Sequence, residues 1–143
     1  MENILISACL FGIGCRYDGK HKVSEDVLDL VGKYNLIPFC PEIYGGLSTP
    51  RVPSERIGDR VMMRDGRDVT ENYEKGAREA LELCRIYGIR TAILKARSPS
   101  CGKGEIYDGS FTGALTERDG VTAELLISEG IRVLTENEIK FLK

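Results

Sequence analysis

The chain has 143 residues, 42% of them hydrophobic, with 20 basic and 22 acidic side chains and a formal net charge of -2. A chain of this length can bury an ordinary hydrophobic core, so we expect a single α/β domain over residues 1–143. The balanced charge disfavours a protein that wraps duplex nucleic acid, and the lack of a long apolar stretch or a basic, apolar leader disfavours a membrane or secreted protein. We expect a cytoplasmic protein whose partner is a small molecule, not a membrane.

The first predicted element is a strand at Asn3–Ser7, a short and continuous apolar run. A glycine-rich loop separates it from a helix predicted over residues 24–35, in which apolar side chains keep helical spacing. A second strand is predicted at Leu36–Phe39, near a sheet edge because Pro38 has no backbone N–H to donate. The following segment, residues 40–53, is rich in proline and glycine and is predicted to be a rigid loop without regular structure.

Asp65-Gly66 is the strongest hairpin signal in the chain and is predicted to join strands within Arg56–Met63 and Arg67–Val69. The longest helix is predicted over residues 71–87, with Thr70 as its cap. Cys84 lies on the apolar stripe of this helix and is predicted to be a small core residue.

The last part of the chain is predicted to contain two further strands, at Thr91–Lys95 and Arg132–Leu134. Between them lie a glycine-rich loop over residues 96–120 and a helix that begins at Thr122. A capping box at residues 135–138 is predicted to open a terminal helix.

The alternation of strands and helices predicts an α/β fold with a mainly parallel four-stranded sheet, helices on both faces and a small β-hairpin excursion. In open parallel sheets, ligands bind beyond the carboxyl ends of the strands, where the strand order reverses. Cys9, Cys40 and Cys101 each follow the end of a predicted strand. We therefore expect these three thiols to lie on the same rim of the sheet.

Thiolates without histidine partners favour soft metals, and the chain has five cysteines but a single histidine. A reducing cytosol argues against a disulfide framework. A cubane iron–sulfur cluster on three cysteines would leave one iron open as a Lewis acid. A zinc site would need a fourth ligand, which Cys15 can supply, although the chain has no CxxC pair.

Three interpretations of these cysteines stay open at this point. The first is an iron–sulfur enzyme, and the second is a non-enzymatic metal- or cluster-binding module with four thiolates. The third is a thiol-redox protein in which Cys9 and Cys15 form a reactive pair.

Polar residues beside the thiols are candidates for catalysis. Glu42 lies two residues after Cys40 and is a candidate general acid or base. Ser98 and Ser100 flank Pro99 next to Cys101 and are candidates for hydrogen bonds to a ligand. An exposed loop carboxylate and ordinary turn serines are the plainer explanations of each residue taken singly.

These motifs together resemble the thiouracil desulfidase (TudS) family, small prokaryotic proteins formerly catalogued as a domain of unknown function. The resemblance is carried, in chain order, by Ser7-Ala8-Cys9-Leu10-Phe11-Gly12, Cys15-Arg16-Tyr17-Asp18-Gly19, Cys40-Pro41-Glu42, Gly46-Leu47, Pro50-Arg51 and Ile93-Leu94-Lys95-Ala96-Arg97-Ser98-Pro99-Ser100-Cys101-Gly102. It spans nearly the whole chain.

The resemblance implies a [4Fe-4S] cluster bound by Cys9, Cys40 and Cys101. It further implies an iron–sulfur-dependent desulfidase that releases sulfide from thiouracil-like pyrimidines, or related thioamides, by non-redox hydrolysis. In that mechanism Glu42 would be the acid/base carboxylate and Ser98, or less directly Ser100, the assisting hydroxyl. Cys15 has no firm role in it.

Overall fold

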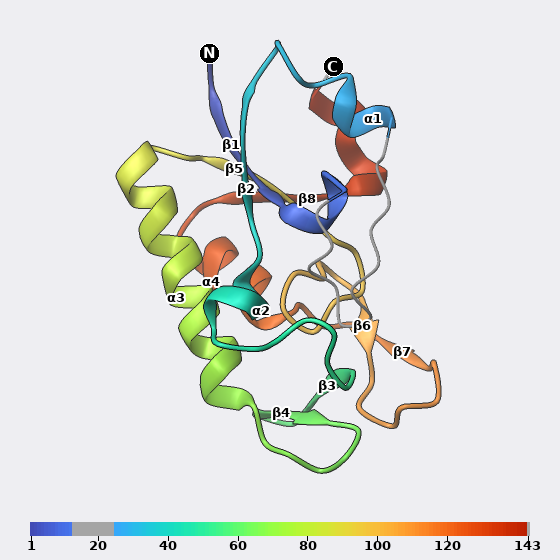
Figure 1. The fold of residues 1–143 in the computed structure, drawn as a ribbon. Helices are drawn as coiled ribbons and strands as arrows, with labels where there is room; N and C mark the ends of the chain where they lie inside the picture. Colours follow the sequence, from blue (N-terminus) through green and yellow to red (C-terminus); the bar gives the residue numbers. More distant parts are fainter. Residues whose placement is uncertain (13–24, 143) are drawn as a thin grey trace.

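A four-stranded parallel sheet forms the centre of the molecule (Figure 1). The computed structural model describes residues 1–12 and 25–142. The sheet has the order β2-β1-β5-β8, and every neighbouring pair is parallel. Its strands are β1 (Asn3–Ser7), β2 (Asn35–Phe39), β5 (Thr91–Leu94) and β8 (Arg132–Thr135). This arrangement confirms the predicted α/β fold with a mainly parallel sheet.

Helices cover both faces of the sheet, as predicted (Figure 1). One face packs against α3 and α4, and the other against α1 and η2. Neighbouring strand residues point to opposite faces, so Leu5 joins the first apolar cluster while Ile4 and Ile6 join the second. The helices are η1 (Ala8–Leu10), α1 (Glu25–Leu28), α2 (Pro41–Tyr44), α3 (Thr70–Tyr87), α4 (Val121–Ser128) and η2 (Glu136–Leu142).

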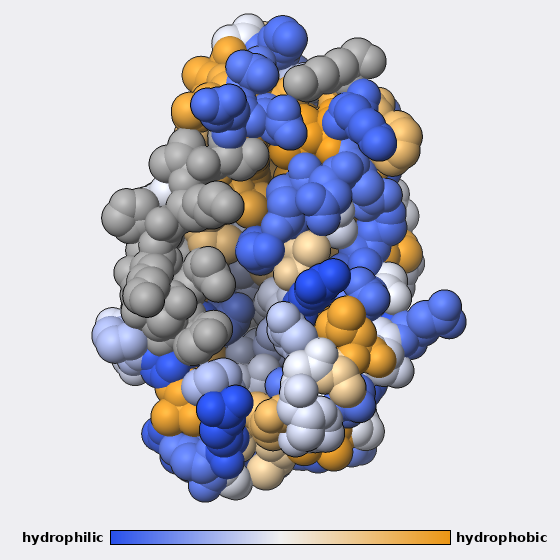
Figure 2. All heavy atoms as spheres, turned by 90° about the vertical axis from the view of Figure 1, so that its right-hand side faces the viewer, coloured by the Kyte–Doolittle hydropathy of each residue, from blue (hydrophilic) through white to orange (hydrophobic). Residues whose placement is uncertain are grey.

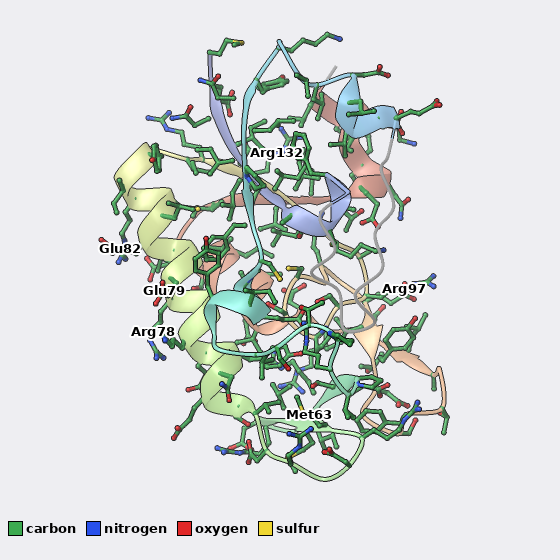
Figure 3. The ribbon with its side chains drawn as sticks, viewed as in Figure 1. Met63, Arg78, Glu79, Glu82, Arg97 and Arg132 are labelled. Carbon is green, nitrogen blue, oxygen red and sulfur yellow. The ribbon has the colours of Figure 1, made fainter. Side chains whose placement is uncertain are left out.

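The long helix α3 forms where its apolar stripe predicts it. It begins at Thr70, one residue earlier than expected, and ends at Tyr87, where the left-handed backbone of the next residue, Gly88 (φ 63°), closes the last turn. Cys84 is buried in the core on this stripe, which confirms its predicted place. On the outer side of the helix, Arg78 and Glu82 project away from the sheet (Figure 3).

Strand β2 lies at the sheet edge, as Pro38 predicts. The N–H of Asn35 donates to the carbonyl oxygen of Glu2, on the β1 side. Successive backbone nitrogens of a strand point to opposite sides, so the nitrogen of Pro38 points away from β1. The imino nitrogen of Pro38 therefore faces the open edge, where it removes a donor that another strand would need.

The helix predicted over residues 24–35 is shorter than expected. Within the described residues, α1 covers only Glu25–Leu28, and residue 24 lies outside them. Val27 and Leu30 are buried as the apolar spacing requires. Gly32, whose φ is 92°, adds a left-handed turn after α1 has ended, so the helix does not continue to residue 35.

The loop predicted over residues 40–53 contains one helical turn, so this prediction is wrong for α2. Pro41 occupies the first turn, where a helix needs no N–H from that residue. Pro41 therefore begins a helix, although proline inside a helix disrupts it.

Two short antiparallel hairpins depart from the predicted pattern. The stretch Arg56–Met63 is not one strand, because the chain reverses between β3 (Ser54–Ile57) and β4 (Arg60–Met63). Asp65-Gly66 does form a turn, but residues 67–69 add only an isolated bridge between Met62 and Asp68. A second hairpin was not predicted, and its strands are β6 (Ile106–Tyr107) and β7 (Leu115–Thr116).

The terminal helix forms behind its predicted capping box, but it is a 3-10 helix. The Glu138 carboxylate accepts a hydrogen bond from the Thr135 N–H at 3.0 Å, as a capping box requires. In the part of the chain that the structure describes, we find no helix with the length and apolar character needed to cross a bilayer.

Helix α2 is held against α3 by a close approach of the two backbones. A Cβ atom at Gly76 of α3 would overlap the carbonyl oxygen of Pro41, and one at Gly45 would overlap the carbonyl oxygen of Asn72. The side-chain amide of Asn72 donates to the carbonyl oxygen of Gly45 at 2.9 Å. Since α2 follows Cys40 directly, α3 fixes the position of this part of the chain.

We predict that Gly76→Ala destabilises the protein by about 1–3 kcal/mol, because the added methyl group must push α2 away from α3. The measurement is the free energy of unfolding in urea. Lys75→Ala, one residue earlier on the exposed side of the same helix, is the control and should change it little. Equal stability of the two variants would contradict the proposed close packing.

Candidate functional site

Cys9, Cys40 and Cys101 line one cavity of about 460 Å³ beyond the carboxyl ends of the sheet strands. Cys9 lies in η1 directly after β1, and Cys40 lies between β2 and α2. Cys101 follows β5 after a short loop. The chain crosses from β1 to β2 on one side and reaches β5 on the other, so the cavity lies where the strand order reverses.

The cavity opens between the sheet and the two hairpins. Figure 2 shows the side of the molecule on which the hairpin β6–β7 lies, and among its coloured residues the apolar patches are separated by hydrophilic side chains. The cavity is lined by Ser7, Ala8, Cys9, Phe39, Cys40, Pro41, Glu42, Arg51, Pro53, Ser54, Glu55, Arg64, Tyr73, Lys95, Ala96, Arg97, Ser98, Pro99, Cys101, Tyr107, Phe111 and Gly113.

A tight turn places Cys101. The Ser98 hydroxyl oxygen accepts hydrogen bonds from the N–H of Ser100 at 3.1 Å and of Cys101 at 3.0 Å. The N–H of Gly102 donates to the Ser98 carbonyl oxygen at 2.8 Å, which closes the turn. The thiol is thus fixed by the backbone of a serine-proline loop, as the sequence pattern indicates.

Cys101 is only 4% exposed. Burial raises the pKa of its thiol from 9.0 to about 12, and the negative charges of Glu42 and Cys40 add to this shift. At neutral pH the unligated thiol keeps its proton, and a bound metal centre would have to displace it.

Glu42 is held in place by two partners. Its Oε2 atom accepts hydrogen bonds from Arg51 Nη2 at 2.6 Å and from the Tyr73 hydroxyl at 3.0 Å. Arg51 is itself fixed, because its Nη1 donates to the carbonyl oxygen of Ser48 and to the Thr49 hydroxyl. Glu42 therefore enters the cavity in a single, supported orientation.

The surroundings of this carboxylate shift the pKa values of its partners. Burial opposes the charge of Arg51, but the neighbouring Glu42 carboxylate outweighs it and raises the Arg51 pKa. Burial, followed by the charge of Glu42, raises the pKa of Tyr73 well above its usual value, so this hydroxyl remains a donor.

The two candidate serines differ in their positions. Ser98 lines the cavity and also holds the turn before Cys101. Ser100 is fully buried, does not line the cavity, and its hydroxyl shares a 2.8 Å hydrogen bond with the Thr122 hydroxyl. Ser100 therefore joins the turn to α4, and only Ser98 is placed to contact a ligand.

The basic residues after β5 already have acidic partners. Lys95 Nζ lies 2.6 Å from Glu136 Oε2, and Arg97 Nε lies 3.6 Å from Glu105 Oε2. The Arg97 side chain points outward from the molecule (Figure 3). Arg97 nevertheless contributes to the cavity wall, and its backbone has a φ of 67°.

One wall of the cavity was not predicted from the sequence. It comes from the two hairpins and includes Glu55, Arg64, Tyr107 and Phe111. Tyr107 belongs to a Tyr-Asp-Gly run that indicates only a turn. Tyr73 was also missed as a partner of Glu42, because it lies on the apolar stripe of α3, where a core residue is the ordinary expectation.

Residues 1–12 and 25–142 contain no group of three or more cysteine, histidine, aspartate or glutamate side chains arranged to hold a single metal ion. Cys15, the candidate fourth thiolate and redox partner, lies outside these residues.

Comparison with known proteins agrees with the motifs and the fold. Residues 4–138 match the family model described as 2-thiouracil desulfurase. The chain belongs to this family. It is 44% identical over 146 residues to the uncharacterized protein YbbK of Bacillus subtilis (strain 168), and the match covers 95% of this chain and 97% of YbbK.

A solved structure of the [4Fe-4S]-dependent thiouracil desulfidase TudS is similar to this chain over almost its whole length. The TM-score is 0.94 and the sequence identity 46%, with 99% of this chain and 95% of that chain covered. These findings confirm the family predicted from the three cysteine motifs.

We predict that Arg51→Ala destabilises the protein by about 3 kcal/mol, because it leaves the Glu42 carboxylate without its cation in a largely buried site. Urea unfolding measures the effect. Arg60→Ala breaks a pair of similar length, Arg60 with Asp68, at the exposed surface and should have little effect. If the two substitutions cost the same, the pair in the cavity does not support the fold as described.

Proposed function

We propose that this chain is a [4Fe-4S]-dependent desulfidase that removes sulfur as sulfide from thiolated pyrimidines by non-redox hydrolysis. The observation that carries the proposal is that Cys9, Cys40 and Cys101 line a single cavity together with Glu42. The family match and the similarity to TudS support the same activity.

The donor set fits an iron–sulfur cluster. All three ligands would be cysteine thiolates, the usual ligands of such clusters. When bound, a cubane held by three thiolates would supply an iron without a protein ligand, a Lewis acid suited to sulfur.

Glu42 would transfer the proton in this reaction. Exchange of a thiocarbonyl sulfur for oxygen consumes water and releases hydrogen sulfide, with no net oxidation or reduction. The attacking water gives up both of its protons and the departing sulfur takes up two, and a fixed carboxylate can carry them one at a time. Arg51 and Tyr73 hold Oε2 of Glu42, which leaves Oε1 for the substrate side.

Ser98 is the second residue that we assign to the substrate. Its hydroxyl oxygen accepts two backbone N–H groups, so its own proton is available for donation into the cavity. A hydrogen bond from this hydroxyl would orient a carbonyl oxygen of the pyrimidine.

The first test is the metal and sulfide content of anaerobically reconstituted protein, with sulfide release from 2- and 4-thiouracil measured on the same sample. We expect about one cubane cluster per chain and sulfide release. Cys101→Ala should lose both. Cys84→Ala removes a cysteine of the core and should keep both, so it is the matched control. Zinc without sulfide release, or activity of the metal-free thiol protein, would refute the proposal.

A second test concerns Glu42. Glu42→Gln keeps an oxygen for Arg51 and Tyr73 but cannot transfer a proton, so we expect the cluster to remain and the rate to fall about 100-fold or more. Iron content and the rate of sulfide release are the measurements. A variant with the wild-type rate would exclude Glu42 as the acid or base.

A further inference from the structure

Phe111 lines the cavity in a backbone conformation that an aromatic residue seldom adopts. It lies in the loop between β6 and β7, and its φ is 57°. Left-handed backbone is uncommon for residues other than glycine, and such residues gather at functional sites where the surrounding structure holds them in place. The retention of a large aromatic side chain here therefore needs an explanation.

A buried carboxylate imposes this conformation. Glu55 of β3 is 8% exposed, and its Oε1 accepts hydrogen bonds from the N–H of Gly109 at 2.9 Å and of Phe111 at 3.1 Å. Gly109 lies against β3 so closely that a Cβ atom there would be 2.8 Å from the carbonyl oxygen of Arg56. The loop is thus fastened to the other hairpin, and Phe111 is fixed with it.

The loop is also braced from within. The Asp108 carboxylate accepts a hydrogen bond from the Ser110 N–H at 2.9 Å, and the hydroxyls of Ser110 and Thr112 lie 2.6 Å apart. Phe111 is therefore presented from a preorganised loop.

Arg64 lies over the ring of Phe111 and supports it from one face. Its guanidinium carbon lies 5.7 Å from the centroid of the Phe111 ring, and both side chains line the cavity. Aromatic faces and guanidinium planes are the surfaces on which proteins stack unsaturated heterocycles. An acyclic substrate would gain little from either.

We propose that Phe111 is a substrate-binding residue whose ring, backed by Arg64, stacks on the planar ring of a thiolated heterocycle. The inference rests on the proposed desulfidase function and narrows it, because it selects cyclic, aromatic thiocarbonyl compounds over acyclic thioamides.

The chain has no tryptophan, which makes a direct binding test possible. Phe111→Trp introduces a single tryptophan at the proposed surface, which can be excited apart from the 6 tyrosines of the chain. Phe141→Trp is the matched control, because Phe141 also has a cation near its ring, Lys140 Nζ at 5.6 Å, yet it is 58% exposed and does not line the cavity. Both variants are made in the full chain with its cluster reconstituted anaerobically.

We expect uracil to quench the fluorescence of Phe111→Trp saturably and to leave that of Phe141→Trp unchanged beyond ordinary collisional quenching. Uracil lacks sulfur, so this readout does not depend on turnover. Equal quenching of the two variants, or no saturable quenching of folded Phe111→Trp, would overturn the inference.

A second variant covers the case in which tryptophan does not fit. Phe111→Gly relieves the left-handed backbone, so it should be no less stable than wild type. Its KM for 2-thiouracil should rise about 10-fold or more, within the range for loss of one base–aromatic stack.

The outcomes separate this inference from the proposed function. If wild type releases no sulfide, the desulfidase proposal fails, and the fluorescence test still decides whether Phe111 contacts the ring. If wild type releases sulfide and Phe111→Gly has an unchanged KM for 2-thiouracil, only the role of Phe111 is refuted.

Discussion

The parallel register of the central sheet determines where the three thiols lie. Ser7 of β1 is level with Phe39 of β2, and Ile6 is level with Ile93 of β5, so these strands end at the same height. The Ser7 hydroxyl accepts a hydrogen bond from the Lys95 N–H at 2.9 Å, which joins the ends of β1 and β5. A shift of one residue in any strand would turn its apolar side chains to the wrong face, so core packing also protects the site.

The site adds two rigid walls to this frame. On one side, α3 holds α2 through Gly76 and fixes the carboxylate through Tyr73. On the other side, Glu55 holds the loop that presents Phe111. Each wall includes a carboxylate with fixed hydrogen-bond partners, the partly buried Glu42 on one side and the buried Glu55 on the other. Such supported side chains meet the need of a catalyst for groups already in position before the substrate arrives.

The sequence predicts the parts of the fold that local pattern determines. The run at Asn3–Ser7 and the stripe of α3 are set by burial of consecutive or helically spaced apolar residues, and both form nearly as expected. The convergence of Cys9, Cys40 and Cys101 follows from their places after strand ends. The turn at Pro41 was missed because proline can begin a helix as readily as prevent one.

Other features depend on contacts between distant segments and have no local signal. The hairpin β6–β7 has only two residues in each strand, and its loop is held by Glu55, more than fifty residues earlier. The Ser100 hydroxyl is hydrogen-bonded to Thr122 of α4, a contact between distant segments. The position of Ser100 next to Cys101 in the sequence therefore does not indicate that Ser100 lies outside the cavity lining. Likewise, the partnership of Tyr73 with Glu42 arises only when α2 packs on α3.

The central claim is that one cavity unites Cys9, Cys40 and Cys101 around one inorganic centre. Native mass spectrometry of the anaerobically reconstituted full chain tests it most directly. The claim predicts a mass increase of about one [4Fe-4S] unit per chain. This increase should disappear when any one of the three cysteines is replaced by alanine. An unchanged cluster mass in any one of the three variants would contradict it.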